Sequence, residues 1–359
     1  MQTKRQSHVI IIGAGPAGLG VAACLARKDI PFTLLERGPA ILTGLRQVDP
    51  AMTLLSPARL SRLPGMELEK GTPTYLRFSD LLSELQCYVQ QNNLSVRTDS
   101  EVVSIRHGSE GFSVQLRSSA GITESILGSH VINATGIISA PQLPENFNPA
   151  ECSFRWLHSL ETRISHLKSS RRLLVVGGGP SAAEVLNNWL EVRRDEDRTW
   201  LSLRSPLVAL PHRVFGIDVH YFGWLPEHFP TRFLGNRSIT VREPMLGREI
   251  PRAINRGRIS RVAAVLRYEG SGVIMKDATQ LEPDLVVFAT GFSYSSSHLG
   301  DLVDYNALGQ PIARACESTR TRRLYLLGLP RGRTFASHYL RGTARDSEYV
   351  AKRIMKDQP

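Results

Sequence analysis

Three glycines at fixed spacing follow a short apolar run near the start of the chain. Gly13, Gly15 and Gly18 form the pattern G-x-G-x-x-G directly after the apolar residues 9–12. Between a strand and a helix, the first glycine allows a tight turn, the second lets the backbone approach a pyrophosphate, and the third lets the helix pack closely on the sheet. The N–H groups that begin such a helix attract phosphate. The stretch therefore predicts a dinucleotide-binding site.

An acidic residue follows at the sequence separation that is typical of ribose binding. The second expected strand, residues 32–35, ends in Glu36, which lies 23 residues after Gly13. An acid at this place binds ribose hydroxyls. The alternative is a signal peptide over residues 4–26, which begins with two basic residues and is apolar. We disfavour it because glycines and a proline interrupt the apolar stretch, and no other run approaches the ~18 apolar residues of a membrane span.

A second glycine pattern lies 164 residues further along the chain. Gly177, Gly179 and Ala182 form G-x-G-x-x-A after the expected strand 173–176, and alanine at the third place still permits close helix packing. The next expected strand, within residues 199–205, ends in Arg204 and Ser205 instead of an acid. Because an arginine there accommodates a 2′-phosphate, the sequence predicts NADPH over NADH. The alternative is that Arg204 is one of many surface arginines.

Two short A-T-G segments, residues 134–136 and 289–291, each follow an expected strand. They mark where the chain crosses between two domains, and the repetition itself indicates a duplicated architecture. Two complete dinucleotide motifs predict a two-nucleotide oxidoreductase of the α/β class.

The chain resembles the small class B flavin-dependent monooxygenases, the group of flavin-containing and YUCCA-type monooxygenases. Besides the two glycine motifs, the resemblance rests on residues 32–38, 54–66 and 324–354. It implies FAD on the first motif and NADPH on the second. In that family NADPH reduces the flavin, oxygen adds at flavin C4a, and the resulting peroxide delivers one oxygen atom to a small substrate.

The implied fold has two Rossmann-like domains, with the NADPH domain inserted into the FAD domain. The expected FAD domain comprises residues 1–148 and 284–359, and the NADPH domain comprises residues 149–283. The predicted cofactor contacts are Gly13, Gly15, Pro16, Ala17, Gly18, Glu36, Arg37, Val103, Ala134, Thr135, Gly136, Gly177, Gly179, Pro180, Ser181, Ala182, Glu184, Arg204, Ser205, Ala289, Thr290 and Gly291.

One stretch departs from the family pattern. The fingerprint F-x-G-x-x-x-H, followed after three residues by an aromatic, here reads CSFRWLH over residues 152–158, with Cys152, Phe154 and Thr162 at the places of the Phe, the Gly and the aromatic. His158 remains as a weak candidate catalytic residue, and the alternative is a packed histidine. The aromatic segment 222–235 is either a wall of the substrate channel or a packed connection.

The charge, cysteine and histidine content limits the classes of ligand and partner that we expect. The net charge is +11, but the arginines are scattered, so we expect no nucleic acid. The four cysteines form no C-x-x-C, which disfavours a redox dithiol or a zinc site and is typical of free thiols in the cytoplasm. The histidines show no H-E-x-x-H or comparable spacing, so no metal is expected. We expect a small substrate, O₂, no membrane, and a homo-oligomer as an open possibility.

The predicted reaction is NADPH- and oxygen-dependent monooxygenation, with a nitrogen or sulfur nucleophile preferred over Baeyer–Villiger insertion. Two alternatives remain open from the sequence. One is an NADPH-dependent flavoprotein reductase that transfers electrons without oxygenation, and the other is a non-catalytic nucleotide-binding module.

Overall fold

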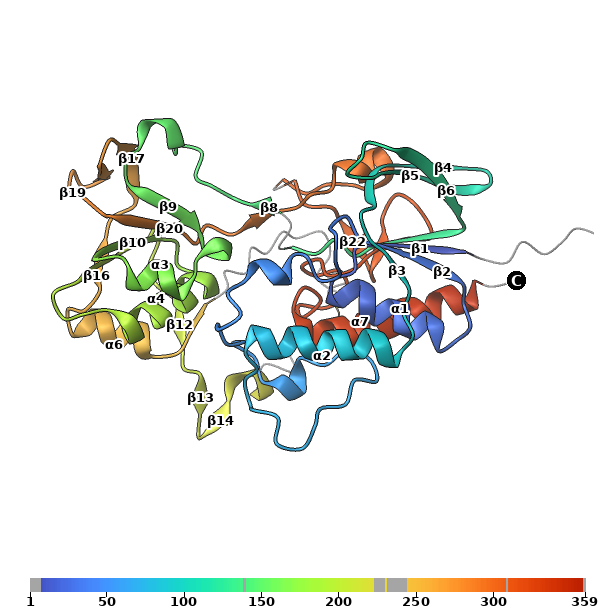
Figure 1. The fold of residues 1–359 in the computed structure, drawn as a ribbon, viewed down its shortest axis with the longest axis horizontal. Helices are drawn as coiled ribbons and strands as arrows, with labels where there is room; N and C mark the ends of the chain where they lie inside the picture. Colours follow the sequence, from blue (N-terminus) through green and yellow to red (C-terminus); the bar gives the residue numbers. More distant parts are fainter. Residues whose placement is uncertain (1–7, 138–139, 223–229, 231–243, 308, 358–359) are drawn as a thin grey trace, which may run out of the picture.

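A computed structural model of the chain describes residues 8–137, 140–222, 230, 244–307 and 309–357. These residues form two lobes, each built around a mainly parallel sheet (Figure 1). Most of the aromatic segment 222–235 lies outside the described residues.

The first lobe contains a seven-stranded sheet in the order β22-β23-β24-β7-β1-β2-β3. The pairs from β24 to β3 are parallel, and β22 and β23 add antiparallel strands at one edge. The central strand β1 is apolar and fully buried, as the sequence predicts for a strand covered on both faces. The strands are β1 (Val9–Ile12), β2 (Phe32–Leu35), β3 (Val96–Arg97), β7 (His130–Asn133), β22 (Ala313–Arg314), β23 (Glu317–Ser318) and β24 (Leu324–Leu326).

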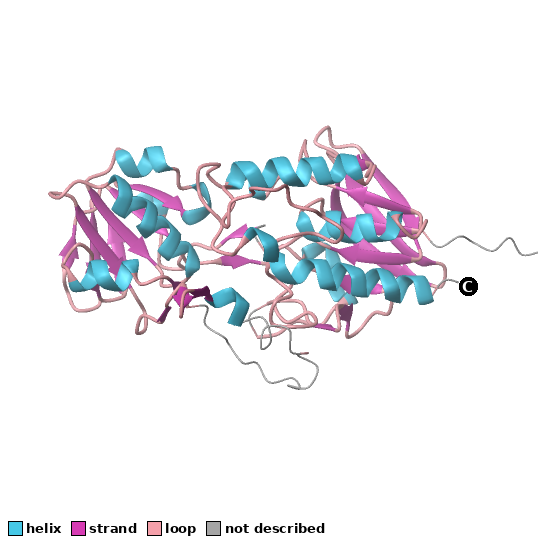
Figure 2. Cartoon of the chain, turned by 90° about the horizontal axis from the view of Figure 1, so that it is seen from below, coloured by secondary structure: helices cyan, strands magenta, loops and turns pink. Residues whose placement is uncertain are grey.

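Different layers cover the two faces of this sheet. Three helices pack on one face around a shared apolar core, and an antiparallel sheet with a 3₁₀ segment covers the other (Figure 1). The helices are α1 (Pro16–Ala26), α2 (Phe78–Gln91) and α7 (Leu340–Lys356). The covering elements are β4 (Glu101–Gly108), β5 (Gly111–Arg117), β6 (Thr123–Gly128) and η6 (Ser297–Leu302). Figure 2 shows the helical side of this lobe.

The second lobe repeats the plan with a parallel sheet in the order β16-β11-β10-β20-β9. The strands are β9 (Arg155–His158), β10 (Arg172–Val176), β11 (Arg198–Ser202), β16 (Ser260–Val262) and β20 (Leu285–Phe288). The helices of the core on one face are α3 (Ile164–Lys168), α4 (Pro180–Val192) and α6 (Glu249–Asn255). The antiparallel strands β17 (Val265–Glu269), β18 (Gly272–Met275) and β19 (Gln280–Leu281) form the other layer with an aromatic core.

The position of β20 corrects one expected boundary. Residues 284–288 were expected to open the returning part of the first domain, but β20 pairs with β10 and β9 in the second sheet. The chain therefore returns after Phe288. The sequence misplaces this step because an apolar four-residue strand reads the same way in either sheet.

Two short strands connect the lobes. β8 (Ala140–Pro141) follows the first A-T-G segment and β21 (Phe292–Ser293) follows the second, and the two pair antiparallel at the junction (Figure 1). The two crossings therefore lie side by side, each within a few residues of an A-T-G segment.

The remaining short elements lie in the connections. They are η1 (Leu45–Gln47), η2 (Ala58–Leu60), η3 (Pro149–Glu151), η4 (Ser159–Glu161), the parallel pair β12 (Ala209–Leu210) and β15 (Met245–Leu246), and the hairpin β13 (Arg213–Val214) and β14 (Ile217–Asp218). None of the described helices combines the length and apolarity that crossing a membrane requires.

Candidate functional site

The first glycine loop has the geometry that its spacing predicts. Gly13 has φ +99°, and a Cβ added there would lie 2.7 Å from the carbonyl oxygen of Ala134. A Cβ at Gly18 would overlap the carbonyl oxygen of Gly13, whereas a Cβ at Gly15 would meet no heavy atom within 4 Å. Packing therefore demands glycine at the first and third places. At the second place the protein leaves the backbone open to the approach of a phosphate.

The start of α1 presents main-chain donors at this loop. Gly15 is the N-cap residue and carries no side-chain cap, and Pro16 occupies the first turn. The positive end of the helix dipole and the uncapped N–H groups suit a pyrophosphate. A Cβ at Gly328 would lie 3.8 Å from the Cβ of Ala17 and 3.9 Å from the Cα of Gly136. Sequence reasoning missed Gly328, although it follows the apolar run 324–327, much as Gly13 follows the apolar run 9–12.

Glu36 lies beside the loop at the end of β2. Its side chain is buried, and its carboxylate accepts hydrogen bonds of 3.0 Å from the backbone N–H groups of Ala14 and Gly38. These two donors fix the carboxylate while leaving lone pairs for ribose hydroxyls. Two other predicted FAD contacts are placed differently from Glu36. Arg37 is exposed, and Val103 lies at a bulge in β4.

The first A-T-G segment is held by side chains that the sequence did not single out. The Asn133 amide donates to the Thr135 hydroxyl at 3.2 Å, and the His298 Nε2 donates to Asn133 Oδ1 at 2.8 Å. Burial lowers the pKa of His298 to about 4, so its ring is neutral at physiological pH. The backbone N–H of Leu327 completes the set by donating to the Asn133 carbonyl.

The second glycine loop repeats the geometry of the first. Gly177 has φ +129°, and a Cβ there would overlap the carbonyl oxygen of Ala289. Gly179 is the N-cap residue of α4, and this position provides no side-chain hydrogen bond to the first turn. A Cβ at Gly179 would again meet nothing within 4 Å. Ala182 is fully buried, and Pro180 occupies the first turn. The residues thus fit a second pyrophosphate.

The expected specificity residues lie at the ends of β11 and α4. Arg204 follows β11 and is exposed, and Ser205 and Ser181 are half-buried. Glu184 lies in the second turn of α4, where burial raises the pKa of its carboxyl to about 7. Arg204 is therefore exposed at the strand end where a 2′-phosphate would lie. Glu184, whose carboxyl pKa is raised, lies on the helix that follows the second glycine loop.

His158 joins the second sheet to a crossing strand. Its side chain is buried, its Nδ1 accepts from the Leu160 N–H at 3.2 Å, and its Nε2 donates to the Gly291 carbonyl at 3.0 Å. The same carbonyl accepts from the Gln142 N–H at 3.0 Å, and the Thr290 hydroxyl donates to the Gln142 carbonyl. Burial lowers the pKa of His158, which suits one donor and one acceptor nitrogen. Both ring nitrogens are hydrogen-bonded to backbone groups, so the geometry favours a role for His158 in positioning the crossing at Gly291. The catalytic role of His158 stays a prediction.

Two of the three altered fingerprint residues are buried, and Cys152 is half-buried. Phe154 is buried in the aromatic core of the second lobe, with its ring 6.4 Å from that of Tyr268. Thr162 is fully buried and its hydroxyl donates to the His158 carbonyl at 3.2 Å. The Cys152 thiol lies 3.4 Å from the Asn148 carbonyl. Phe154 and Thr162 thus form part of the packing around β9.

Comparisons with known proteins agree with this architecture. Residues 10–201 match the protein family described as pyridine nucleotide-disulphide oxidoreductase. The chain is 27% identical to an uncharacterized CzcO-like oxidoreductase of Geobacillus kaustophilus, with 97% of this chain and 98% of the relative covered. It is also 27% identical to the indole-3-pyruvate monooxygenase YUCCA1 of rice, Oryza sativa subsp. japonica, with coverage of 98% and 93%.

A solved structure shows the same fold. The flavin-containing monooxygenase from Stenotrophomonas maltophilia superposes with a TM-score of 0.76 at 23% identity, and 98% of each chain is covered. The expected fold class, two Rossmann-like dinucleotide-binding domains, is confirmed.

Proposed function

This chain belongs to the pyridine nucleotide-disulphide oxidoreductase family and is a flavin-dependent oxidoreductase, and within that class we propose that it is an FAD- and NADPH-dependent monooxygenase of small organic molecules. One observation carries the proposal: two complete phosphate-binding loops lie on separate lobes joined by paired crossing strands. This arrangement suits one resident flavin and one exchanging nicotinamide nucleotide.

The first loop is the proposed FAD site. The uncapped start of α1 would bind the pyrophosphate, and the Glu36 carboxylate would accept hydrogen bonds from the ribose hydroxyls. Ala134, Thr135 and Gly136 lie at the adjacent strand end, which Asn133 and His298 hold. Bound FAD would supply the hydride acceptance and oxygen activation that side chains cannot perform.

The second loop is the proposed NADPH site. The start of α4 would bind the pyrophosphate, and Arg204 would pair with the 2′-phosphate. His158 and Gln142 hold the crossing at Gly291, so they set how the second lobe presents its nucleotide to the first. The described residues thus bind and orient the two cofactors.

For the substrate, we propose a soft nitrogen or sulfur nucleophile. The sequence between Arg204 and the second A-T-G segment is short, which suits a small substrate. The rice relative is named for action on indole-3-pyruvate, so an α-keto acid belongs in the test panel. Ketones test Baeyer–Villiger insertion.

Product analysis with isotopically labelled dioxygen tests the proposal. The flavin-loaded protein is supplied with NADPH and a panel of amines, thioethers, ketones and α-keto acids. Substrate-dependent NADPH oxidation with one labelled oxygen atom in an amine or thioether product is expected. Labelled products from ketones alone would contradict the nitrogen and sulfur preference, and no labelled product with any substrate would contradict the monooxygenase.

The second candidate is an NADPH-dependent reductase, which the family description favours. Against it, the sequence contains no C-x-x-C pair, and Cys24 and Cys316 are buried. Reduction of disulfides or quinones by NADPH, with no oxygenated product, would establish this candidate. The free thiols suit the cytoplasmic location that we propose.

A further inference from the structure

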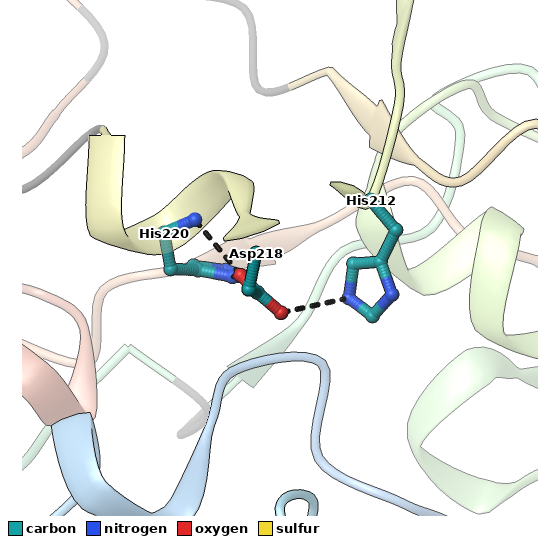
Figure 3. A group of neighbouring side chains, drawn as sticks. All are labelled: His212, Asp218 and His220. Carbon is teal, nitrogen blue, oxygen red and sulfur yellow. Dashed lines mark hydrogen bonds and ion pairs between the residues drawn. The ribbon is translucent and has the colours of Figure 1, made fainter. Parts of the chain in front are cut away.

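A histidine–aspartate–histidine cluster lies at the hairpin β13–β14, outside both nucleotide loops. His212, Asp218 and His220 each offer one ligand atom, and these atoms all lie within 4.8 Å of one another (Figure 3). The sequence expectation of no metal site rested on standard spacings, and H-x₅-D-x-H is not among them. The turn of the hairpin brings the three side chains together.

The atoms are close to the arrangement that a metal ion requires. His220 Nδ1 lies 2.7 Å from Asp218 Oδ1, and His212 Nε2 lies 3.9 Å from Asp218 Oδ2. Zinc holds imidazole nitrogen and carboxylate oxygen at ~2.0–2.2 Å, which places tetrahedral ligands about 3.3–3.5 Å apart. Side-chain rotations that move these ligand atoms by roughly 1 Å would therefore bring all three to coordination distance from one ion.

Hydrogen bonds hold the proposed carboxylate ligand in place. Asp218 and His220 are buried, and the Tyr75 hydroxyl donates to Asp218 Oδ2. The backbone N–H of His220 donates to Asp218 Oδ1 at 2.9 Å. An outer partner of this kind orients a metal ligand, as metal sites commonly require.

Two elements of the first lobe contact the cluster. The Tyr75 ring stacks on His212 with centroids 5.1 Å apart, and His212 Nε2 lies 3.2 Å from the Leu55 carbonyl. A cavity of about 820 Å³, lined in part by Tyr75 and His212, provides an entry path. The cavity is lined by Arg213, Arg248 and Arg252 and by one acidic residue, Glu249, so a cation would be held by coordination and not by the net positive charge of the lining.

We propose that His212, Asp218 and His220 bind one divalent transition-metal ion of the zinc type, with water as the remaining ligand. The ion would hold the two ends of the hairpin together beside Tyr75 of the first lobe, and coordination through His212 Nε2 would replace the hydrogen bond of that nitrogen to the Leu55 carbonyl.

Zinc titration of the full-length, flavin-loaded protein, freed of metal with a chelator, tests the site. One zinc ion per chain is expected after desalting, and X-ray absorption should show nitrogen and oxygen ligands near ~2.0–2.1 Å without a sulfur shell near ~2.3 Å. Binding should persist at high salt, because screening weakens exposed ion attraction but not coordination.

Variants assign the ligands. His212→Ala and His220→Ala should each weaken zinc binding, and Tyr75→Phe, which keeps all three ligands, should weaken it by roughly tenfold. His107→Ala is the matched control, since His107 is an exposed histidine on β4. If His220→Ala does not fold, zinc binding by His212→Gln tests the site instead. His212 is one-third exposed, so this substitution should leave the fold intact. Equal zinc affinity in the His212 variants and wild type, a sulfur shell, or no binding by the wild type would overturn the proposal.

Discussion

The imidazole of His158 donates to the carbonyl oxygen of Gly291, the residue at which the chain leaves the second sheet for the first lobe. The bond is 3.0 Å long, and the same carbonyl accepts the Gln142 N–H from the other crossing strand. One buried side chain thus ties a sheet strand to both connections between the lobes.

Replacing His158 should reduce stability more than chemistry. His158→Ala leaves the Leu160 N–H and the Gly291 carbonyl without their side-chain partner, which costs about 1–3 kcal/mol of unfolding free energy. Urea unfolding measures this loss, with His107→Ala as the exposed control. Unchanged unfolding together with a large fall in kcat and an altered pH–rate profile would instead establish His158 as catalytic.

Substitutions at the second and third glycines of the first loop should have different effects. Gly15→Ala keeps an extended backbone with φ −79° and meets no protein atom, so the chain should fold, yet the methyl group obstructs the flavin pyrophosphate. FAD affinity should fall at least tenfold, equal to ~1.4 kcal/mol. Gly18→Ala overlaps the Gly13 carbonyl and should destabilise the fold itself. Circular dichroism and flavin titration distinguish the two results, and retained FAD affinity in Gly15→Ala would contradict the site.

Arg204 should govern the choice of nucleotide. Arg204→Ala removes a charge-assisted contact to the 2′-phosphate, so the KM for NADPH should rise roughly 10- to 100-fold, equal to ~1.4–2.7 kcal/mol, while that for NADH stays unchanged. Steady-state NADPH oxidation measures both. Arg198→Ala, at the opposite end of β11, is the control. Equal changes for NADPH and NADH would place Arg204 outside the phosphate site.

Glu184 should make stability depend on pH. Burial raises the pKa of its folded-state carboxyl to about 7, above its unfolded value, so ionisation destabilises the fold as pH rises from about 4.5 to about 7. Glu184→Gln should therefore gain up to ~3 kcal/mol at about pH 8 and less than ~1 kcal/mol at about pH 5. Urea midpoints at both pH values test this, with exposed Glu191→Gln on the same helix as control. The same gain at both pH values would refute the titration.

The sequence by itself determined the two nucleotide loops, their strands and helices, and the two A-T-G segments that precede the crossings between the lobes. It could do so because each loop is a local motif: the glycines, the helix start and the preceding strand are neighbours along the chain. Glu36 follows the same logic, since the spacing within one β-α-β unit predicts where its carboxylate lies.

Only the tertiary structure decided the features that depend on distant segments. The pairing of β20 assigned residues 285–288 to the second sheet, and the crossing at Gly291 gave His158 its distant backbone partner. Gly328 approaches Ala17 and Gly136 from the far end of the chain. His212, Asp218 and His220 meet because a hairpin folds back beside Tyr75. Such contacts are set by how sheets and lobes pack, and local residue order does not encode that packing.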